Sequence, residues 1–237
     1  MQEESINKRP IILITGASGD LGIELVKQSV QQNWKVVAVT KTISKLQDRL
    51  PIEYFNEIDV CEIDLSVVRS PKDFKQLLKY TFNYVVLNAG ILIKKDFHDF
   101  TVEELNKQFN VNFFSNVYLL QSLIPQNIDN KNNHIIAVGS MSGIENSAKF
   151  KQMTMYGASK SALHNIMQTL AAEYQNKNIV FNTIAFGAIK TQMLEKAFGK
   201  INEAVLPSQA AKFILNFATH GKKVVNGKIL YASKSII

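Results

Sequence analysis

The sequence predicts an α/β protein built as one doubly wound parallel sheet of about seven strands, with helices on both faces. Two observations predict this fold. Short apolar runs rich in Val and Ile recur along the chain, and several are apolar almost throughout, as strands covered on both faces are. Segments of helical period separate these runs, and strict alternation of strand and helix is typical of a parallel sheet.

The elements follow one another without an interruption that would divide the chain. The strand candidates are residues 10–15, 35–40, 58–63, 84–88, 134–140, 179–185 and 227–232. The helix candidates are residues 21–32, 72–81, 102–124, 156–175 and 208–218, the last beginning after a plausible cap at Pro207-Ser208. No internal repeat or linker-like stretch appears, so we predict a single domain over residues 1–237, with residues 1–9 as a flexible polar tail.

Composition narrows the function classes. The chain has 237 residues and a net charge of +7, but its lysines are scattered rather than clustered with Arg and aromatic residues, which argues against nucleic-acid binding. No stretch approaches the roughly 18 apolar residues that a membrane helix needs, and no signal peptide is recognisable. The lone Cys61 fits a reducing compartment, and the four histidines show no metal-ligand spacing. We therefore expect a cytoplasmic protein with no metal site and no membrane partner.

The stretch TGASGDLG (residues 15–22) lies between the first strand candidate and the first helix candidate. Glycines in such a turn let the backbone approach a pyrophosphate at the helix N-terminus, so we predict a Rossmann-like dinucleotide site. The predicted contact residues are Gly16, Ser18, Gly19, Asp20, Leu21 and Gly22. We expect the contact at Asp20 to come from its backbone, with the carboxylate beginning the helix and pointing to solvent.

The end of the second strand indicates which dinucleotide binds. An acid there would bind the ribose hydroxyls of NAD, whereas a basic residue suits the 2′-phosphate of NADP. The sequence has Lys41 and Thr42 at this place, which favours NADP(H) and leaves NAD(H) possible. The alternative is that Lys41 is one more surface lysine of a lysine-rich chain.

Tyr156 and Lys160 open the fourth helix candidate four residues apart, on one face of the helix. A nearby ammonium would stabilise the phenolate and lower the pKa of Tyr156. Tyr156 is therefore a candidate proton donor and acceptor.

The chain resembles the short-chain dehydrogenase/reductase family, in its compact single-domain branch, through seven motifs in the family's order. They are TGASGDLG, Asp64-Leu65, Leu87-Asn88-Ala89-Gly90, Val111-Asn112, Ala137-Val138-Gly139-Ser140, Tyr156 with Lys160, and Gly187 with Thr191. Each motif is loose alone, but each lies on the element where the family places it. The resemblance implies a strand order of 3-2-1-4-5-6-7.

The resemblance also implies a role for each matching residue. Tyr156 would exchange a proton with the substrate oxygen, Lys160 would tune Tyr156 and hold the nicotinamide ribose, and Ser140 would hydrogen-bond the substrate oxygen. Asn112 would position a water for proton relay toward Lys160. The further implied cofactor contacts are Asp64, Leu65, Asn88, Ala89, Gly90, Gly187, Ile189 and Thr191.

Two departures from the family pattern affect the substrate pocket. The loop between Ser140 and Tyr156 is longer than usual, so Ser142 is a second candidate for the catalytic hydroxyl. Phe186 replaces the proline that usually precedes Gly187, which reshapes the pocket wall. The predicted pocket residues are Met141, Ser142, Ile144, Met153, Phe186, Met193 and Leu194.

These observations predict an NADP(H)-preferring oxidoreductase that interconverts a carbonyl and a secondary alcohol of a small molecule. By resemblance, the helices near 102–124 and 156–175 would pair subunits into a homodimer or homotetramer. Two alternatives stay open. The glycine spacing matches that of the family's extended branch and allows a non-redox epimerase or dehydratase with bound nicotinamide. The second alternative is a sensing protein that binds NADP at the glycine turn but catalyses no reaction.

Overall fold

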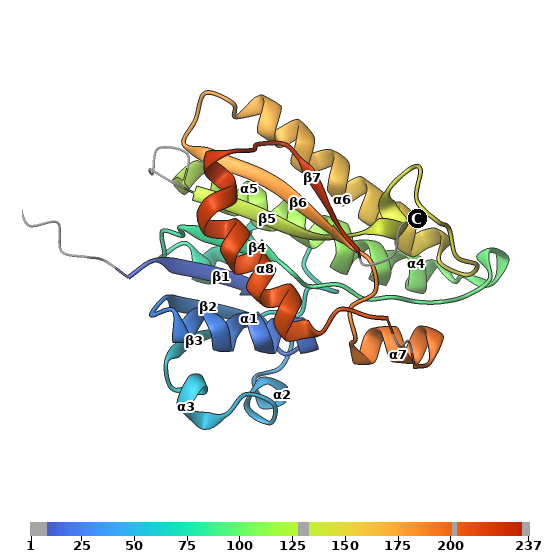
Figure 1. The fold of residues 1–237 in the computed structure, drawn as a ribbon, viewed down its shortest axis with the longest axis horizontal. Helices are drawn as coiled ribbons and strands as arrows, with labels where there is room; N and C mark the ends of the chain where they lie inside the picture. Colours follow the sequence, from blue (N-terminus) through green and yellow to red (C-terminus); the bar gives the residue numbers. More distant parts are fainter. Residues whose placement is uncertain (1–8, 128–132, 201–202, 234–237) are drawn as a thin grey trace, which may run out of the picture.

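A seven-stranded parallel sheet forms the centre of the molecule (Figure 1), in a computed structural model that describes residues 9–127, 133–200 and 203–233. The strands are β1 (Ile11–Thr15), β2 (Lys35–Thr40), β3 (Ile58–Glu62), β4 (Tyr84–Leu87), β5 (Asn133–Ser140), β6 (Ile179–Phe186) and β7 (Ile229–Ala232). Their order is β3-β2-β1-β4-β5-β6-β7, and every neighbouring pair is parallel. The predicted doubly wound single-domain fold and its strand order are confirmed. Of the predicted tail at 1–9, only Arg9 lies within the described residues, and it donates to the Asn33 carbonyl at 3.1 Å.

The helices differ more from the prediction than the strands do. The α-helices are α1 (Asp20–Gln31), α2 (Ile43–Gln47), α3 (Ile52–Phe55), α4 (Val102–Phe109), α5 (Ser115–Asn127), α6 (Thr154–Glu173), α7 (Gln192–Phe198) and α8 (Pro207–His220). The helix predicted over 102–124 is helical from Val102 to Asn127, but a π-helical turn (Asn110–Phe114) between α4 and α5 was not predicted. The helix predicted over 72–81 is only a 3₁₀ segment (Pro71–Leu77), and short α2, α3 and α7 were not predicted at all.

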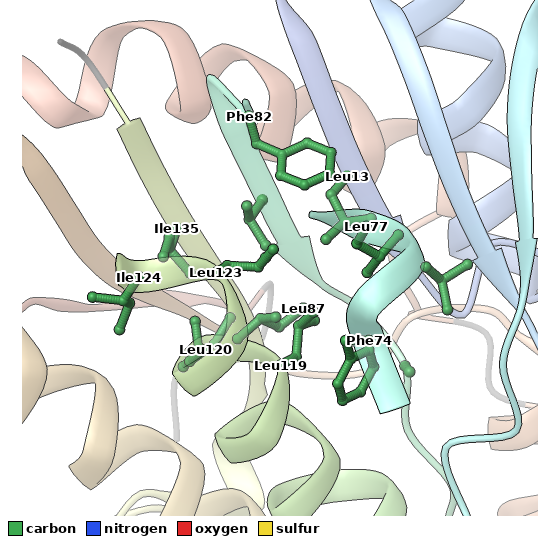
Figure 2. Close-up of a cluster of buried hydrophobic side chains, with 14 of the residues drawn as sticks. Leu13, Phe74, Leu77, Phe82, Leu87, Leu119, Leu120, Leu123, Ile124 and Ile135 are labelled. Carbon is green, nitrogen blue, oxygen red and sulfur yellow. The ribbon is translucent and has the colours of Figure 1, made fainter. Parts of the chain in front are cut away.

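The two faces of the sheet bury separate apolar cores. On one face, side chains of α5 and of the 3₁₀ segment meet the strands, as Figure 2 shows for Phe74, Leu77, Leu119 and Leu123. On the other face, α1 and α8 pack side by side across the strands (Figure 1). Alternate residues of the central strands enter opposite cores, as Leu13 and Ile14 do, which is why these strands are apolar nearly throughout. Because all strands are parallel and packed between these cores, their carboxyl ends lie at the same edge of the sheet.

Candidate active site

The glycine turn joins β1 to α1 at the carboxyl edge of the sheet. Gly16 has φ of +66°, and a Cβ there would lie 2.8 Å from the Cα of Ala89, so only glycine fits. Gly22 lies in the first turn of α1, where a Cβ would lie 2.3 Å from the Gly16 carbonyl oxygen. The N-cap of α1 is Gly19, and no side chain of the described residues caps it. The first N–H groups of the helix are therefore open to an anion, as a pyrophosphate site requires.

The carboxylate of Asp20 does not point to solvent, and that prediction is wrong. Asp20 forms an ion pair with Arg49 and accepts the backbone N–H of Gln192 at 2.6 Å, with only 18% of its side chain exposed. Arg49 also donates to the Ser18 carbonyl at 2.6 Å. The carboxylate therefore joins the glycine turn to α7 on one side and to the segment after α2 on the other.

Charged side chains surround the cleft beyond the end of β2. Lys41 lines the cleft and pairs with Asp64 at 2.8 Å. Burial acts to raise the pKa of Asp64, but hydrogen bonds from Lys41 and Ser66 outweigh it and hold this pKa below its ordinary value. Lys45 and Arg49 also line this part of the cleft. Sequence reasoning missed both, although they lie within ten residues of Lys41.

The segment after β4 is anchored to β1. The Thr15 hydroxyl accepts the backbone N–H groups of Asn88 and Ala89 at 3.0 Å each. The Asn88 amide in turn donates to the Thr15 carbonyl at 2.9 Å. These bonds hold Asn88 and Gly90 at the wall of the cleft beside the glycine turn.

Ser140, Tyr156 and Lys160 meet in the same cleft, brought there by the end of β5 and the first turns of α6. Burial raises the pKa of Tyr156, and a hydrogen bond with Ser140 offsets part of this rise. The oxygens of Ser140 and Ser142 lie 2.8 Å apart, so both candidate hydroxyls belong to one hydrogen-bonded group. Of this group, Ser140 has a hydrogen bond with Tyr156.

Lys160 lies beside Tyr156, but its ammonium is bonded to β5. Its Nζ donates to the Val138 carbonyl at 2.9 Å and lies 5.9 Å from the centre of the Tyr156 ring. Burial lowers the pKa of Lys160 itself to about 8. The ammonium is therefore held against β5 and lies close to Gly90, where a Cβ would come within 3.3 Å of Nζ.

Asn112 lies in the π-helical turn, behind the wall of the cleft. Its Oδ1 accepts the Ile91 N–H at 2.8 Å, and its Nδ2 donates to the Ile91 carbonyl at 2.9 Å and to Ser159 at 3.0 Å. Asn116 donates to the Asn112 carbonyl at 2.9 Å. The π-turn thus aims Asn112 at the backbone after Gly90, where it braces this wall.

The cleft has a volume of about 740 Å³ and brings together most of the predicted residues. Those that line it are Gly16, Ser18, Gly19, Asp20, Leu21, Lys41, Asp64, Leu65, Asn88, Ala89, Gly90, Ser140, Met141, Ser142, Met153, Tyr156, Lys160, Phe186, Gly187, Ile189, Thr191, Met193 and Leu194. Four predicted residues do not line it. Gly22 packs inside α1, Thr42 is the N-cap of α2, Asn112 lies behind Gly90, and the Ile144 side chain is buried elsewhere.

An aromatic contact between two residues that line the cleft was not predicted. Phe150, from the long loop after β5, meets Phe198 of α7 edge-on, with ring centres 5.9 Å apart. Lys94 lies over the Phe198 ring at 4.3 Å and donates to the Ala197 carbonyl at 2.7 Å. This contact therefore connects the loop after β5 to α7 at the cleft. The length of the loop was the only sequence signal for Phe150, and α7 had none.

The described residues include neither a metal-binding cluster nor a membrane-spanning helix. No group of three His, Cys, Asp or Glu residues in that part of the chain is arranged to hold a metal ion. No helix there is long and apolar enough to cross a membrane.

Known proteins resemble the chain in both sequence and fold. An uncharacterized oxidoreductase of Staphylococcus epidermidis is 27% identical over 191 residues, which cover 79% of this chain and 81% of that protein. One of Staphylococcus aureus is 24% identical over 217 residues, covering 90% and 93%. The solved structure of ElxO with NADP bound has a TM-score of 0.83 at 20% identity, covering 95% of this chain and 98% of the other. That of 3-ketoacyl-(acyl-carrier-protein) reductase from Brucella melitensis complexed with NADH also has a TM-score of 0.83 at 20% identity, covering 94% and 96%.

A family model described as short chain dehydrogenase matches residues 10–202. This match includes the glycine turn, both candidate serines, Tyr156 and Lys160. The chain therefore belongs to the short-chain dehydrogenase family and is an oxidoreductase of that family.

Proposed function

We propose that the protein is an NADP(H)-preferring enzyme that interconverts a carbonyl and a secondary alcohol. The observation that carries this proposal is the cleft itself, in which Ser140 contacts Tyr156 beside Lys160 and the glycine turn lies on the same edge. A proton-transfer group and a dinucleotide cradle in one cleft are what hydride transfer to a carbonyl needs.

The residues at hand fit a nicotinamide dinucleotide. Gly16 and the uncapped N-terminus of α1 would hold the pyrophosphate, Lys41 with Lys45 would face the adenosine end, and Thr191 would hold the nicotinamide carboxamide. A reduced nicotinamide supplies the hydride when it is bound there. The neighbouring structures include one named with NADP and one named with NADH, which supports a nicotinamide cofactor and makes the preference for NADP a proposal resting on the basic residues.

The proton-transfer step then falls to this chain's own residues. Tyr156 gives its proton to the substrate oxygen as the carbonyl carbon is reduced, and takes it back when the alcohol is oxidised. Ser140 donates a hydrogen bond to the same oxygen while negative charge develops there. Asn112 acts as a positioning residue that holds the backbone at Ile91, because its side-chain amide is occupied by Ile91 and Ser159.

The pocket beside this group favours an apolar substrate body. The apolar residues that line it include Leu92, Met141, Met153, Met193 and Phe198. We propose a ketone or secondary alcohol whose polar group points inward to Ser140 and Tyr156. Its apolar remainder lies toward Phe150.

The alternatives differ in what the cleft must contain. A sensor needs the cradle but no proton donor, and the Ser140–Tyr156 contact supports catalysis over sensing. An epimerase or dehydratase is disfavoured by the relatives, which share most of their length with this chain and are named as oxidoreductases.

Assembly and location complete the proposal. We propose a homodimer or homotetramer that pairs through α4, α5 and α6, where Val102 and Phe114 are exposed apolar residues. A cytoplasmic location is proposed from the buried free thiol of Cys61, which fits a reducing compartment.

The test is NADPH consumption, followed across a panel of apolar ketones, by wild type and by Tyr156→Phe. We expect the variant to lose at least about 100-fold in kcat while it still binds NADPH, because it loses only the transferable proton. Tyr174→Phe, at the far end of the same helix, should keep wild-type turnover. Equal turnover by wild type and Tyr156→Phe would exclude the mechanism, and nicotinamide that stays bound without net turnover would favour the non-redox alternative.

A further inference from the structure

His164 is a buried histidine close to the cleft to which the proposed chemistry gives no role. It lies on α6 four residues after Lys160, so the two side chains leave the same face of the helix. That face packs on β5, the strand that ends at Ser140.

Two side chains one helical turn apart hold the end of β5. Lys160 donates to the Val138 carbonyl at 2.9 Å, and the backbone N–H of Ser140 donates to Nε2 of His164 at 3.3 Å. Gly139, between them, lies flat against the imidazole, since a Cβ there would come within 2.4 Å of Nε2. Two hydrogen bonds thus hold the end of β5 on α6, with Lys160 as the donor in one and His164 as the acceptor in the other.

The imidazole also shapes the turn that follows the strand. Gly143 closes the turn that carries Ser140 and Ser142, and a Cβ at Gly143 would lie 2.9 Å from Cε1 of His164. A side chain at Gly139 or at Gly143 would collide with the ring. The position of both serines therefore depends on His164.

The hydrogen bond requires one protonation state of the ring. Nε2 accepts the Ser140 N–H, so the neutral ring carries its proton on Nδ1, which faces the backbone of Gly143 without a well-formed hydrogen bond in the described chain. Burial, together with the charge of Lys160, lowers the pKa of His164 to about 4. The ring is neutral near pH 7 and can act as this acceptor.

We propose that His164 is a positioning residue of the proton-transfer site: as a hydrogen-bond acceptor it fixes the backbone of Ser140 and so holds the hydroxyl that contacts Tyr156. The role in turnover rests on the proposed function. The hydrogen bond to Ser140 does not, and it can be measured without any substrate.

The experiment compares two variants of similar size. His164→Gln keeps an acceptor at the reach of Nε2, whereas His164→Leu removes it. We expect His164→Leu to lose on the order of tenfold in kcat, because small displacements of catalytic groups are costly, with KM for NADPH within about twofold of wild type. His164→Gln should keep kcat within about threefold. Met167→Ala, which empties buried space on the same helix outside the cleft, controls for lost packing and should keep wild-type kcat per folded molecule.

The pH profile gives a readout that loose packing alone would not move. Tyr156 is faced by Ser140 from β5 and by Lys160 from its own helix. If Ser140 drifts away, the phenol loses the bond that lowers its pKa, so the profile of kcat for alcohol oxidation should shift to higher pH in His164→Leu. The profiles of His164→Gln and Met167→Ala should coincide with that of wild type.

A second measurement separates failure of this inference from failure of the proposed function. In protein labelled with ¹⁵N-serine, the Ser140 amide should exchange with D₂O at least about tenfold faster in His164→Leu than in His164→Gln. Equal exchange in the two variants, or equal kcat and pH profile in His164→Leu and wild type, would overturn the inference. If exchange at Ser140 depends on the acceptor at position 164 but the protein reduces no ketone, the hydrogen bond stands and the proposed interconversion of carbonyl and alcohol is rejected instead.

Discussion

Lys41, Lys45 and Arg49 reach the same part of the cleft, but they are paired differently. Arg49 is bound to Asp20 and to the Ser18 carbonyl, and Lys41 is bound to Asp64. An ion pair at a half-exposed surface is worth about 1 kcal/mol or less, so Lys41 can exchange Asp64 for a phosphate at small cost. Lys41 is therefore suited to bind a 2′-phosphate even though it forms an ion pair with Asp64.

Replacing Lys41 tests this at the level of a single residue. In Lys41→Ala we expect KM for NADPH to rise roughly tenfold, because one charge-assisted hydrogen bond to the phosphate is lost, while KM for NADH changes less than about twofold. Lys35→Ala is the matched control, since Lys35 also pairs with an acid, Asp59 at 3.0 Å, but lies at the opposite end of β2. If KM rises equally for both cofactors, Lys41 does not discriminate between them.

At the level of elements, Asp20 connects the glycine turn to α7. The N-terminus of α7 is capped twice, by the Thr191 hydroxyl, which accepts the Leu194 N–H at 3.2 Å, and by Asp20, which accepts the Gln192 N–H. Helix N-termini favour such acceptors and negative charge. A residue of the cofactor turn thus helps to hold the helix that carries Met193, Leu194 and Phe198 over the substrate pocket.

Removing this connection should loosen α7 and leave the sheet intact. In Asp20→Ala we expect the amides of α7 to exchange hydrogen about tenfold faster, the equivalent of one lost hydrogen bond to a charged group, with a several-fold rise in KM for the ketone. Glu24→Ala is the control, because Glu24 lies one turn along α1 and pairs with Lys27 at 3.0 Å. Unchanged exchange in α7 would show that Thr191 suffices as its cap.

Elements whose own sequence determines them were predictable, and those that depend on distant partners were not. The central strands β1, β2, β4, β5 and β6 read as apolar runs because they are buried on both faces. Tyr156 and Lys160 were predictable because their spacing on one helix matches a motif of the family that the sequence resembles. The π-turn at Asn112 could not be read, because the tertiary bonds of Asn112 to Ile91 and Ser159 hold it in place. Asp20 was misplaced for the same reason, since Arg49 and Gln192 lie far along the chain.

At the scale of the whole molecule, His134 joins three elements inside the fold. Its ring on β5 lies 3.1 Å from the Ala218 carbonyl of α8 and 3.0 Å from the Asn182 amide of β6. With Nδ1 as the donor and Nε2 as the acceptor, both contacts are satisfied by the neutral ring. Burial lowers the pKa of His134 to about 4, and the charge of Lys222 also lowers it. The hydrogen bond to the Ala218 carbonyl acts to raise this pKa but does not offset the burial.

This buried histidine should make the fold sensitive to acid. The folded-state pKa of about 4 lies below the ordinary 6.5, so between these values the unfolded chain binds more protons than the folded one. The free energy of unfolding should therefore fall as the pH drops from 6.5 to 4, by about 3 kcal/mol for His134, with the same sign for His164. Well above pH 6.5 both rings are neutral in either state and contribute no slope.

Urea unfolding at several pH values measures this contribution directly. His134→Asn keeps a donor in the place of Nδ1 but cannot titrate, so its stability should fall by about 3 kcal/mol less than that of wild type between pH 6.5 and 4. His98→Gln, at an exposed histidine on the surface, should follow the wild-type curve. If His134→Asn runs parallel to wild type over this range, protonation of His134 does not limit the acid stability of the fold, and the slope must come from the carboxylates or from His164.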